Sequence, residues 1–275
     1  MLPRQALLAG NPRAAELDPV LRAAERALRT WQPIRTGFLD PALREAAAAL
    51  LEPLSELVVY ADGGYGGAER CQLVLCRRAP GEGAEAAAEG GADPDAAAVP
   101  APLEGLEIVG NFLFDPARPG EFEALLLQLG ASEPERGDLW LRGDRGAQVV
   151  VAAGLADRLQ GREALLRSVP VRCEKRPLAE LRPPRAIASR DLSTVEASLR
   201  LDALASAGFG LSRSRMAGLI RQGAVRLNWQ PVSSPSRLLR QGDRVRLEGR
   251  GELTILTVMP TQRGRLRVAM RRGGG

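Results

Sequence analysis

Residues 200–248 read RLDALASAGFGLSRSRMAGLIRQGAVRLNWQPVSSPSRLLRQGDRVRLE and combine two short helical patterns, two strand patterns and many arginines. From Arg200 to Gly275, 15 arginines stand against four acidic residues, so this part carries a net charge of +11. The whole chain carries only +5, which leaves about −6 for residues 1–199. Such a separation is typical of a polyanion-binding domain joined to a near-neutral or acidic body, and it predicts nucleic acid as the partner.

The second helical pattern of this stretch breaks a local rule. The first helix has an apolar face over 201–209, and Ser212 is a favourable N-cap for the second, SRSRMAGLIRQG, which Gly223 ends. Arg213 and Arg215 fall in its first turn, where the helix dipole disfavours a cation by roughly 0.3–1 kcal/mol. Because acids would be the stabilising choice there, the two arginines indicate a role outside folding.

We expect these guanidinium groups, together with the free backbone N–H groups at the same helix end, to hold a phosphate. The alternative is that they are solvated surface charges in an arginine-rich protein. Ser212 and Ser214 would position the backbone or hydrogen-bond to it, while neighbouring arginines extend the positive field. The predicted RNA-binding residues are Arg200, Ser212, Arg213, Ser214, Arg215, Arg221, Arg226, Asn228 and Trp229.

Trp229 follows the strand VRLN (225–228), in the turn that the sequence predicts there. A tryptophan does not easily adopt a positive φ, so we expect this turn to differ from one built on glycine. Two interpretations of the side chain stay open. It stacks on an RNA base, which is worth roughly 1–3 kcal/mol, or it packs on its own domain.

Composition excludes several classes of chemistry. The chain has no histidine, which removes Ser-His-Asp and Cys-His nucleophilic sites and histidine-ligated metals. Its three cysteines, Cys71, Cys76 and Cys173, do not have the spacing of zinc sites and are interpreted as small buried side chains in a reducing compartment. No run of 18 apolar residues occurs. We expect a cytoplasmic, monomeric protein without cofactor, metal or membrane insertion, and without catalytic activity.

Before the basic stretch, the pattern predicts helices over 13–31 and 41–54, the second starting at Asp40, and strands over 57–60 and 70–77. Residues 79–102 are rich in Ala, Gly, Pro and acid, and we expect a disordered insert. A further strand begins near Leu103, and then come a helix over 121–130, a hairpin over 137–154, a helix over 154–169 and a strand over 170–178. The expected organisation is a helical region 1–55, a central α+β domain 56–182, a linker 183–199 and a basic domain 200–275.

The order of features in 200–248 resembles the RNA-binding domain first seen in ribosomal protein S-four. TGFLDP (36–41), GGYGGAERCQLVL (63–75), GDLWL (137–141) and QVVVA (148–152) occur in the order seen in YlmH-like proteins, a family that includes the photosystem II S-four-domain proteins. The resemblance implies an α+β chain with an N-terminal helical region, a central RRM-like domain proposed to bind RNA, and a C-terminal S-four-type (alpha-L) domain. Trp229, where many such domains have glycine, departs from the pattern, as do the insert and the lack of histidine.

The family resemblance also implies a function. Members are linked to ribosome-associated quality control, so the implied partners are rRNA and tRNA on a stalled large ribosomal subunit. Links to cell division and photosystem II are looser. Two rivals stay open: an RNA-modifying enzyme of the pseudouridine synthase or methyltransferase type, since S-four-type domains accompany both, and a photosystem II assembly factor.

The glycine-rich run 63–67 follows a strand but fits neither the P-loop nor the dinucleotide fingerprint. Three interpretations are open: a mononucleotide loop, a structural loop, or a backbone-mediated RNA contact in which Tyr65 stacks on a base and Arg70 binds phosphate. The residues of this possible second RNA surface are Gly64, Tyr65, Gly66 and Arg70.

Overall fold

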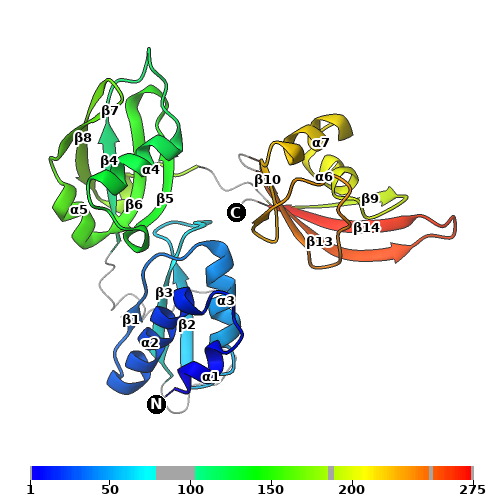
Figure 1. The fold of residues 1–275 in the computed structure, drawn as a ribbon, viewed down its shortest axis with the longest axis horizontal. Helices are drawn as coiled ribbons and strands as arrows, with labels where there is room; N and C mark the ends of the chain where they lie inside the picture. Colours follow the sequence, from blue (N-terminus) through cyan, green and yellow to red (C-terminus); the bar gives the residue numbers. More distant parts are fainter. Residues whose placement is uncertain (1, 79–102, 185–188, 248–249, 274–275) are drawn as a thin grey trace. The chain divides into compact units, whose positions relative to one another are not determined.

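The computed structural model describes residues 2–78, 103–184, 189–247 and 250–273. The chain forms two compact units, Met1–Pro184 and Arg185–Gly275. Helices and antiparallel strands make up both units, which confirms the α+β fold class (Figure 1). The expected disordered insert 79–102 lies outside the described residues.

The N-terminal part of the first unit is a small three-stranded sheet with helices packed against it. The strand order is β1-β3-β2, and Leu73 and Leu75 of β3 share one hydrophobic core with Leu17 and Leu21 of α2. Asp40 caps α3 as expected, accepting a hydrogen bond from Leu43 N at 2.8 Å. The elements are α1 (Arg4–Leu8), α2 (Ala14–Thr30), β1 (Ile34–Arg35), α3 (Pro41–Leu51), β2 (Leu57–Asp62) and β3 (Gln72–Arg77).

This packing corrects the expected division at residue 55. The expected central domain 56–182 includes the strands β2 and β3, but these strands complete the core of the preceding helices. The apolar faces of α2 and α3 require a sheet to cover them, and these two strands supply it. The helical region and the first two long strands therefore form one layered structure.

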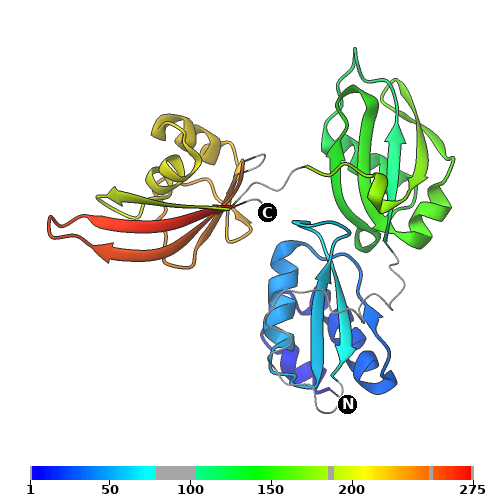
Figure 2. The same ribbon diagram turned by 180° about the vertical axis from the view of Figure 1, so that it is seen from behind.

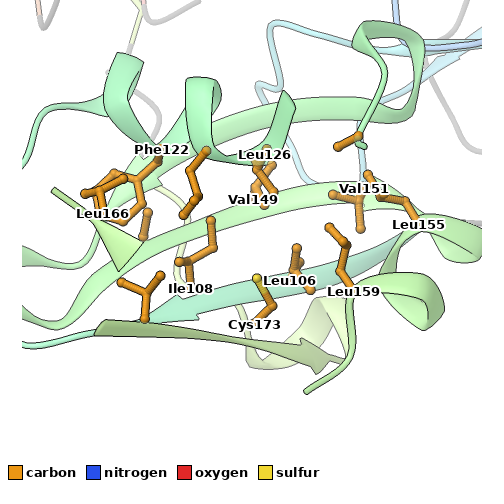
Figure 3. Close-up of a cluster of buried hydrophobic side chains, with 14 of the residues drawn as sticks. Leu106, Ile108, Phe122, Leu126, Val149, Val151, Leu155, Leu159, Leu166 and Cys173 are labelled. Carbon is orange, nitrogen blue, oxygen red and sulfur yellow. The ribbon is translucent and has the colours of Figure 1, made fainter. Parts of the chain in front are cut away.

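The central sheet follows in the strand order β5-β6-β4-β8-β7, with all neighbours antiparallel. The order of elements is β-α-β-β-α-β with β7 added before the last strand, which is the split βαβ arrangement of RRM-like domains. Figure 3 shows its core, where Phe122 and Leu126 of α4 meet Ile108 and Val149 of the sheet. The elements are β4 (Leu103–Val109), α4 (Pro119–Gln128), η3 (Glu133–Glu135), β5 (Arg136–Leu141), η4 (Gly143–Arg145), β6 (Gly146–Ala152), α5 (Ala153–Leu159), β7 (Glu163–Leu166), β8 (Val169–Arg176) and η5 (Leu178–Glu180).

One predicted helix in this domain is wrong. The pattern over 154–169 predicts a single helix, but α5 ends at Leu159 and residues Glu163–Leu166 form β7. Gly161 has a φ of 73° and turns the chain, after which β7 pairs with β8. Pairing with a neighbouring strand outweighs the strong intrinsic helical preference of the sequence EALL.

The second unit is a six-stranded antiparallel sheet with two helices on one face (Figures 1 and 2). The strand order is β11-β10-β12-β13-β14-β9, and Leu204 and Phe209 of α6 and Met216 and Ile220 of α7 pack on its inner side chains. The elements are β9 (Arg190–Glu196), α6 (Leu201–Phe209), α7 (Arg213–Arg221), β10 (Val225–Leu227), β11 (Gln230–Pro231), β12 (Arg244–Leu247), β13 (Gly251–Pro260) and β14 (Leu266–Gly273).

The expected linker 183–199 is also only partly right, because Arg190–Glu196 form the edge strand β9 of this sheet. Its seven residues pair antiparallel with β14, from Arg190 opposite Arg272 to Glu196 opposite Leu266. The partner strand lies about seventy residues later, so no local pattern reveals the pairing. Within the described ranges, no helix has the length and apolarity needed to cross a membrane.

Candidate nucleic-acid interface

The predicted corner is built from the short connection between α6 and α7. Gly210 ends α6 in the left-handed conformation with a φ of 66°. Ser212 then caps α7, its hydroxyl accepting a hydrogen bond from Arg215 N at 3.3 Å. Met216 and Ile220 anchor the helix in the core, so its first turn stays at the surface. The backbone N–H groups of the first helical residues have no partner within the helix, as at any helix start.

Two of the predicted arginines share one buried acid. Asp202 of α6 is 5% exposed and accepts hydrogen bonds from Arg200 Nε at 3.1 Å and Nη2 at 3.0 Å. Arg213 Nη2 donates to Oδ1 of the same carboxylate at 3.1 Å, the oxygen that also accepts from Arg200 Nε. Burial acts to raise the pKa of Asp202, but the hydrogen bonds from both guanidinium groups prevail and lower it below its ordinary value. Sequence reasoning gave Asp202 no role.

This acid explains Arg213 in a way that the sequence does not. Arg213 is the first residue of α7, and Asp202 supplies the negative charge that this helix start otherwise lacks. The ion pair therefore gives Arg213 a place in the fold. Its side chain is still 56% exposed, and the triad of Arg200, Asp202 and Arg213 keeps one net positive charge.

Arg215 has no such partner. It is exposed, and among the described residues no ion pair or side-chain hydrogen bond involves its guanidinium group. Ser214 beside it is also exposed, and its hydroxyl lies 3.3 Å from that of Ser212. Arg221 is exposed in the last turn of the helix, where a cation is favoured by the dipole. Of the arginines in α7, Arg215 is thus the one that folding does not explain.

The sheet contributes a second cationic group that includes residues sequence reasoning missed. Val225 is fully buried, so Arg226, the next residue of β10, points away from the core. Arg226 lies directly opposite Arg246 of β12 in the strand register. Arg244 precedes Arg246 by two residues and shares its face. The alternation RVRL in 244–247 is the signal that could have revealed this stripe.

The turn between β10 and β11 contradicts the prediction made for Trp229. Asn228 and Trp229 have φ values of 48° and 69°, and Leu227 lies opposite Gln230, so the chain forms a two-residue turn with both central residues left-handed. Asn228 makes this possible, because its amide Nδ2 donates to Asp243 Oδ1 at 2.8 Å and its Oδ1 accepts from Arg244 N at 2.9 Å. Asn228 therefore has a structural role.

The Trp229 side chain lies among arginines. The guanidinium carbons of Arg244 and Arg246 are 5.1 Å and 5.9 Å from its ring centroid, within cation–π distance. The indole is half-buried, and none of the described residues forms a hydrogen bond with its Nε1. A non-glycine residue in this conformation costs roughly 1–2 kcal/mol. Strain of this kind at a cationic surface is typical of functional sites.

The glycine-rich loop has a different place. Asp138 of β5 accepts hydrogen bonds from Tyr65 Oη at 2.8 Å, Glu69 N at 2.7 Å and Arg70 N at 3.0 Å. The Tyr65 ring packs edge-on against Trp140, with centroids 5.6 Å apart. Burial raises the pKa of Asp138, although the Arg70 amide and the Tyr65 hydroxyl act against it.

The geometry of this loop requires glycine. The Tyr65 hydroxyl and the Arg70 guanidinium group already form hydrogen bonds within the protein. A Cβ on Gly63 would lie 2.3 Å from that of Ala68, and Gly64 has a φ of 84° next to Val150. Arg70 donates from Nε to Arg136 O at 3.0 Å and from Nη2 to Glu133 O at 3.2 Å. These contacts favour the structural-loop interpretation over the second RNA surface.

The same loop covers part of the sheet face that faces away from α4 and α5. Trp140 and Val150 on this face are buried with Leu181, and Tyr65 and Leu178 pack against them. In RRM domains this face presents aromatic side chains on which RNA bases stack. Here the chain itself occupies part of that position. A Cβ added at Gly66 of the predicted surface would meet nothing within 4 Å, but the residue carries no side chain.

Three comparisons place the chain among known proteins. The model of the YlmH N-terminal region matches residues 13–79, and the S4 domain model, which describes the S-four-type domain, matches residues 199–245. The ribosome-associated protein quality control protein P2 of Bacillus subtilis (strain 168) is 28% identical over 148 residues, 54% of this chain and 57% of that protein. The cell division protein ylmH from Streptococcus pneumoniae aligns with 62% of this chain and 94% of that one, with 19% identity and a TM-score of 0.45.

The match thus spans little more than half the length of the curated relative. The S4 match ends at Val245, inside β12, so β13 and β14 lie beyond it. Among the described residues, no cluster of three cysteine or acidic side chains is placed to hold a metal ion.

Proposed function

We propose that this chain, which matches the models of the YlmH N-terminal region and of the S4 domain, is a non-catalytic RNA-binding protein that associates with the ribosome. The observation that carries the proposal is Arg215 at the start of α7. It is exposed and has no ion pair among the described residues, beside backbone N–H groups that a phosphate oxygen can use. No acidic side chain among the described residues pairs with this positive charge, whereas a bound polyanion would pair with it.

The proposal extends to the whole positive surface of the S4 domain. Arg226, Arg244 and Arg246 add positive charge on the sheet, and Trp229 adds a ring on which a base can stack. Arg200 and Arg213 contribute through the net charge of their triad with Asp202. The residues therefore divide into phosphate contacts, which set most of the affinity, and one aromatic contact.

We also propose a role in the quality control of stalled large subunits, with rRNA and tRNA as the bound RNAs. The support is the name of the Bacillus subtilis relative, which describes a ribosome-associated quality control protein. Binding of the full-length chain to isolated large subunits with and without peptidyl-tRNA tests this part. Equal affinity for both would leave general RNA binding and remove the quality-control role.

The RNA-binding proposal is tested by the double variant Arg215→Gln/Arg226→Gln in a salt titration with a fluorescent single-stranded RNA. The slope of log K against log salt is negative, and each lost phosphate contact reduces its magnitude by about 0.7. The matched control is Arg26→Gln/Arg29→Gln, which removes the same charge from exposed positions on α2. Equal slopes for the two variants would refute the site, and a wild type that does not bind RNA would refute the function.

The enzyme alternative has a separate test. Incubation of the protein with RNA, with and without S-adenosylmethionine, followed by analysis of modified nucleosides, would reveal methyltransferase or pseudouridine synthase activity. We expect unmodified RNA. No observation bears on the photosystem II assembly alternative, which stays a prediction.

A further inference from the structure

The hairpin of β13 and β14 extends beyond the part of the sheet that the helices cover (Figure 1). Fully buried side chains on these strands end at Ile255 and Val268, and Met259 is 53% exposed. β9 pairs along β14 as far as Leu266, so three strands support the end of the hairpin. At about 3.4 Å per residue, the ten residues of β13 reach roughly 30 Å. We refer to residues 259–267, with Val195 beside them, as the arm.

The end of the arm is strongly cationic. Arg263, Arg265 and Arg267 are all exposed, and no ion pair joins any of them to another described residue. They line a hollow of about 850 Å³ together with Val195 and Met259. In the strand register Arg267 lies between these two apolar residues, opposite Met259 on one side and Val195 on the other.

The arginines do not build the turn on which they lie. Thr261 closes it, with Thr261 N donating to Arg265 O at 2.7 Å and Arg265 N donating to Thr261 Oγ1 at 3.1 Å. Gly264 supplies the left-handed residue, with a φ of 69°. Only the backbone of Arg265 takes part in these bonds. The three guanidinium groups therefore repel one another and form no bond that stabilises the turn.

Arg271 on β14, in contrast to these three arginines, forms an ion pair within the fold. Its Nε and Nη2 donate to both carboxylate oxygens of Asp191, at 2.7 Å and 3.1 Å. Glu196, the acid opposite Leu266 near the arm, instead accepts a hydrogen bond from Thr194. The chain thus pairs the arginine at the base of the hairpin and leaves three at its end without a described counter-charge.

We infer that the arm is a second RNA-contacting surface, separate from the α7 start, on which Arg263, Arg265 and Arg267 bind the phosphate backbone. Met259 and Val195 offer apolar area to the sugars between the phosphates. The inference rests on the proposed function, and it concerns residues beyond the matched S4 region. Three phosphate contacts on the arm lengthen the footprint of the protein on RNA and add to the salt dependence of binding.

The test compares Arg263→Gln/Arg265→Gln/Arg267→Gln with the equally charged control Arg22→Gln/Arg26→Gln/Arg29→Gln on α2, both in the full-length chain. The probes are single-stranded oligouridylates of increasing length. We expect the affinity of the wild type and the control to rise with length until the RNA reaches the arm. The arm variant loses this later rise, and the magnitude of its negative salt slope decreases by about two units, at about 0.7 for each of three phosphates.

The outcomes separate the two proposals. If the wild type binds RNA and the arm variant matches the control at every length, the arm inference is wrong and the proposed function stands. If the wild type does not bind RNA, both fail. If the arm variant binds RNA normally but no longer co-sediments with ribosomes, the arm contacts a protein, which also overturns the inference.

Discussion

Asp202, near the start of α6, accepts a hydrogen bond at 3.1 Å from Arg213, the first residue of α7. The two helices meet at this pair, and Arg200 donates to both oxygens of the same carboxylate. The acid is buried while both arginines reach solvent, so one charge serves the fold and leaves a positive surface. The start of α7 is thereby prepared for an anion without the helix being destabilised by Arg213.

Asp202→Asn should lower the free energy of unfolding of the second unit by about 1–2 kcal/mol at neutral pH, because hydrogen bonds to a charged group are lost. Urea denaturation monitored by tryptophan fluorescence measures this, since Trp229 lies in that unit. Asp191→Asn is the control, because its partner Arg271 is exposed and the loss should be much smaller. Equal losses of unfolding free energy in the two variants would show that the buried triad stabilises the unit no more than the exposed pair does.

The same carboxylate predicts a dependence on pH. The pKa of Asp202 is lowered in the folded protein from its ordinary value of 3.8, so the folded state binds fewer protons there than the unfolded state. Its contribution is complete above about pH 4 and is lost as the pH falls further. Denaturation between pH 5 and pH 2.5 should therefore show a steeper decline for the wild type than for Asp202→Asn. Parallel curves would contradict the assignment.

The loop 63–70 predicts a stability effect without a binding effect. Tyr65→Phe removes one hydrogen bond to Asp138 and should cost about 0.5–1.5 kcal/mol. Asp138→Asn should cost about 1–3 kcal/mol, because an amide cannot accept from both backbone N–H groups that now meet the carboxylate. Thermal unfolding measures the losses. RNA affinity of both variants should equal that of the wild type, and a marked drop for Tyr65→Phe would restore the second RNA surface.

Trp229→Gly should separate stability from binding. Glycine removes backbone strain of roughly 1–2 kcal/mol, which offsets the lost contacts with Arg244 and Arg246, about 0.5–1 kcal/mol each. The free energy of unfolding should therefore change by less than about 1 kcal/mol. Affinity for single-stranded RNA should fall by roughly 1–3 kcal/mol if the ring stacks on a base. Unchanged affinity would leave Trp229 as a packing residue.

Several features of the fold could be predicted because they are local. Ser212 starts α7 and Asp40 starts α3, since each cap needs only its own side chain and the next turn. The helix predicted over 154–169 is wrong at Glu163–Leu166, because pairing of β7 with β8 outweighs the helical preference of these four residues. The prediction for the turn at Trp229 failed for a related reason. Asn228 in this turn forms hydrogen bonds with Asp243 and Arg244, which lie fifteen and sixteen residues away in the sequence.

The candidate site shows the same division. The sequence alone determined the concentration of arginine after Arg200, the caps and apolar faces of the helices and the order of strands and turns around them, because composition and short-range periodicity carry these. The tertiary structure alone decided that Arg213 pairs with Asp202, while Arg215 has no ion pair among the described residues. It also decided that Asp138 holds the Tyr65 loop and that β9 supports the arm. Such contacts depend on which distant residues a compact chain brings together, and side-chain charge acts only on the neighbours it meets there.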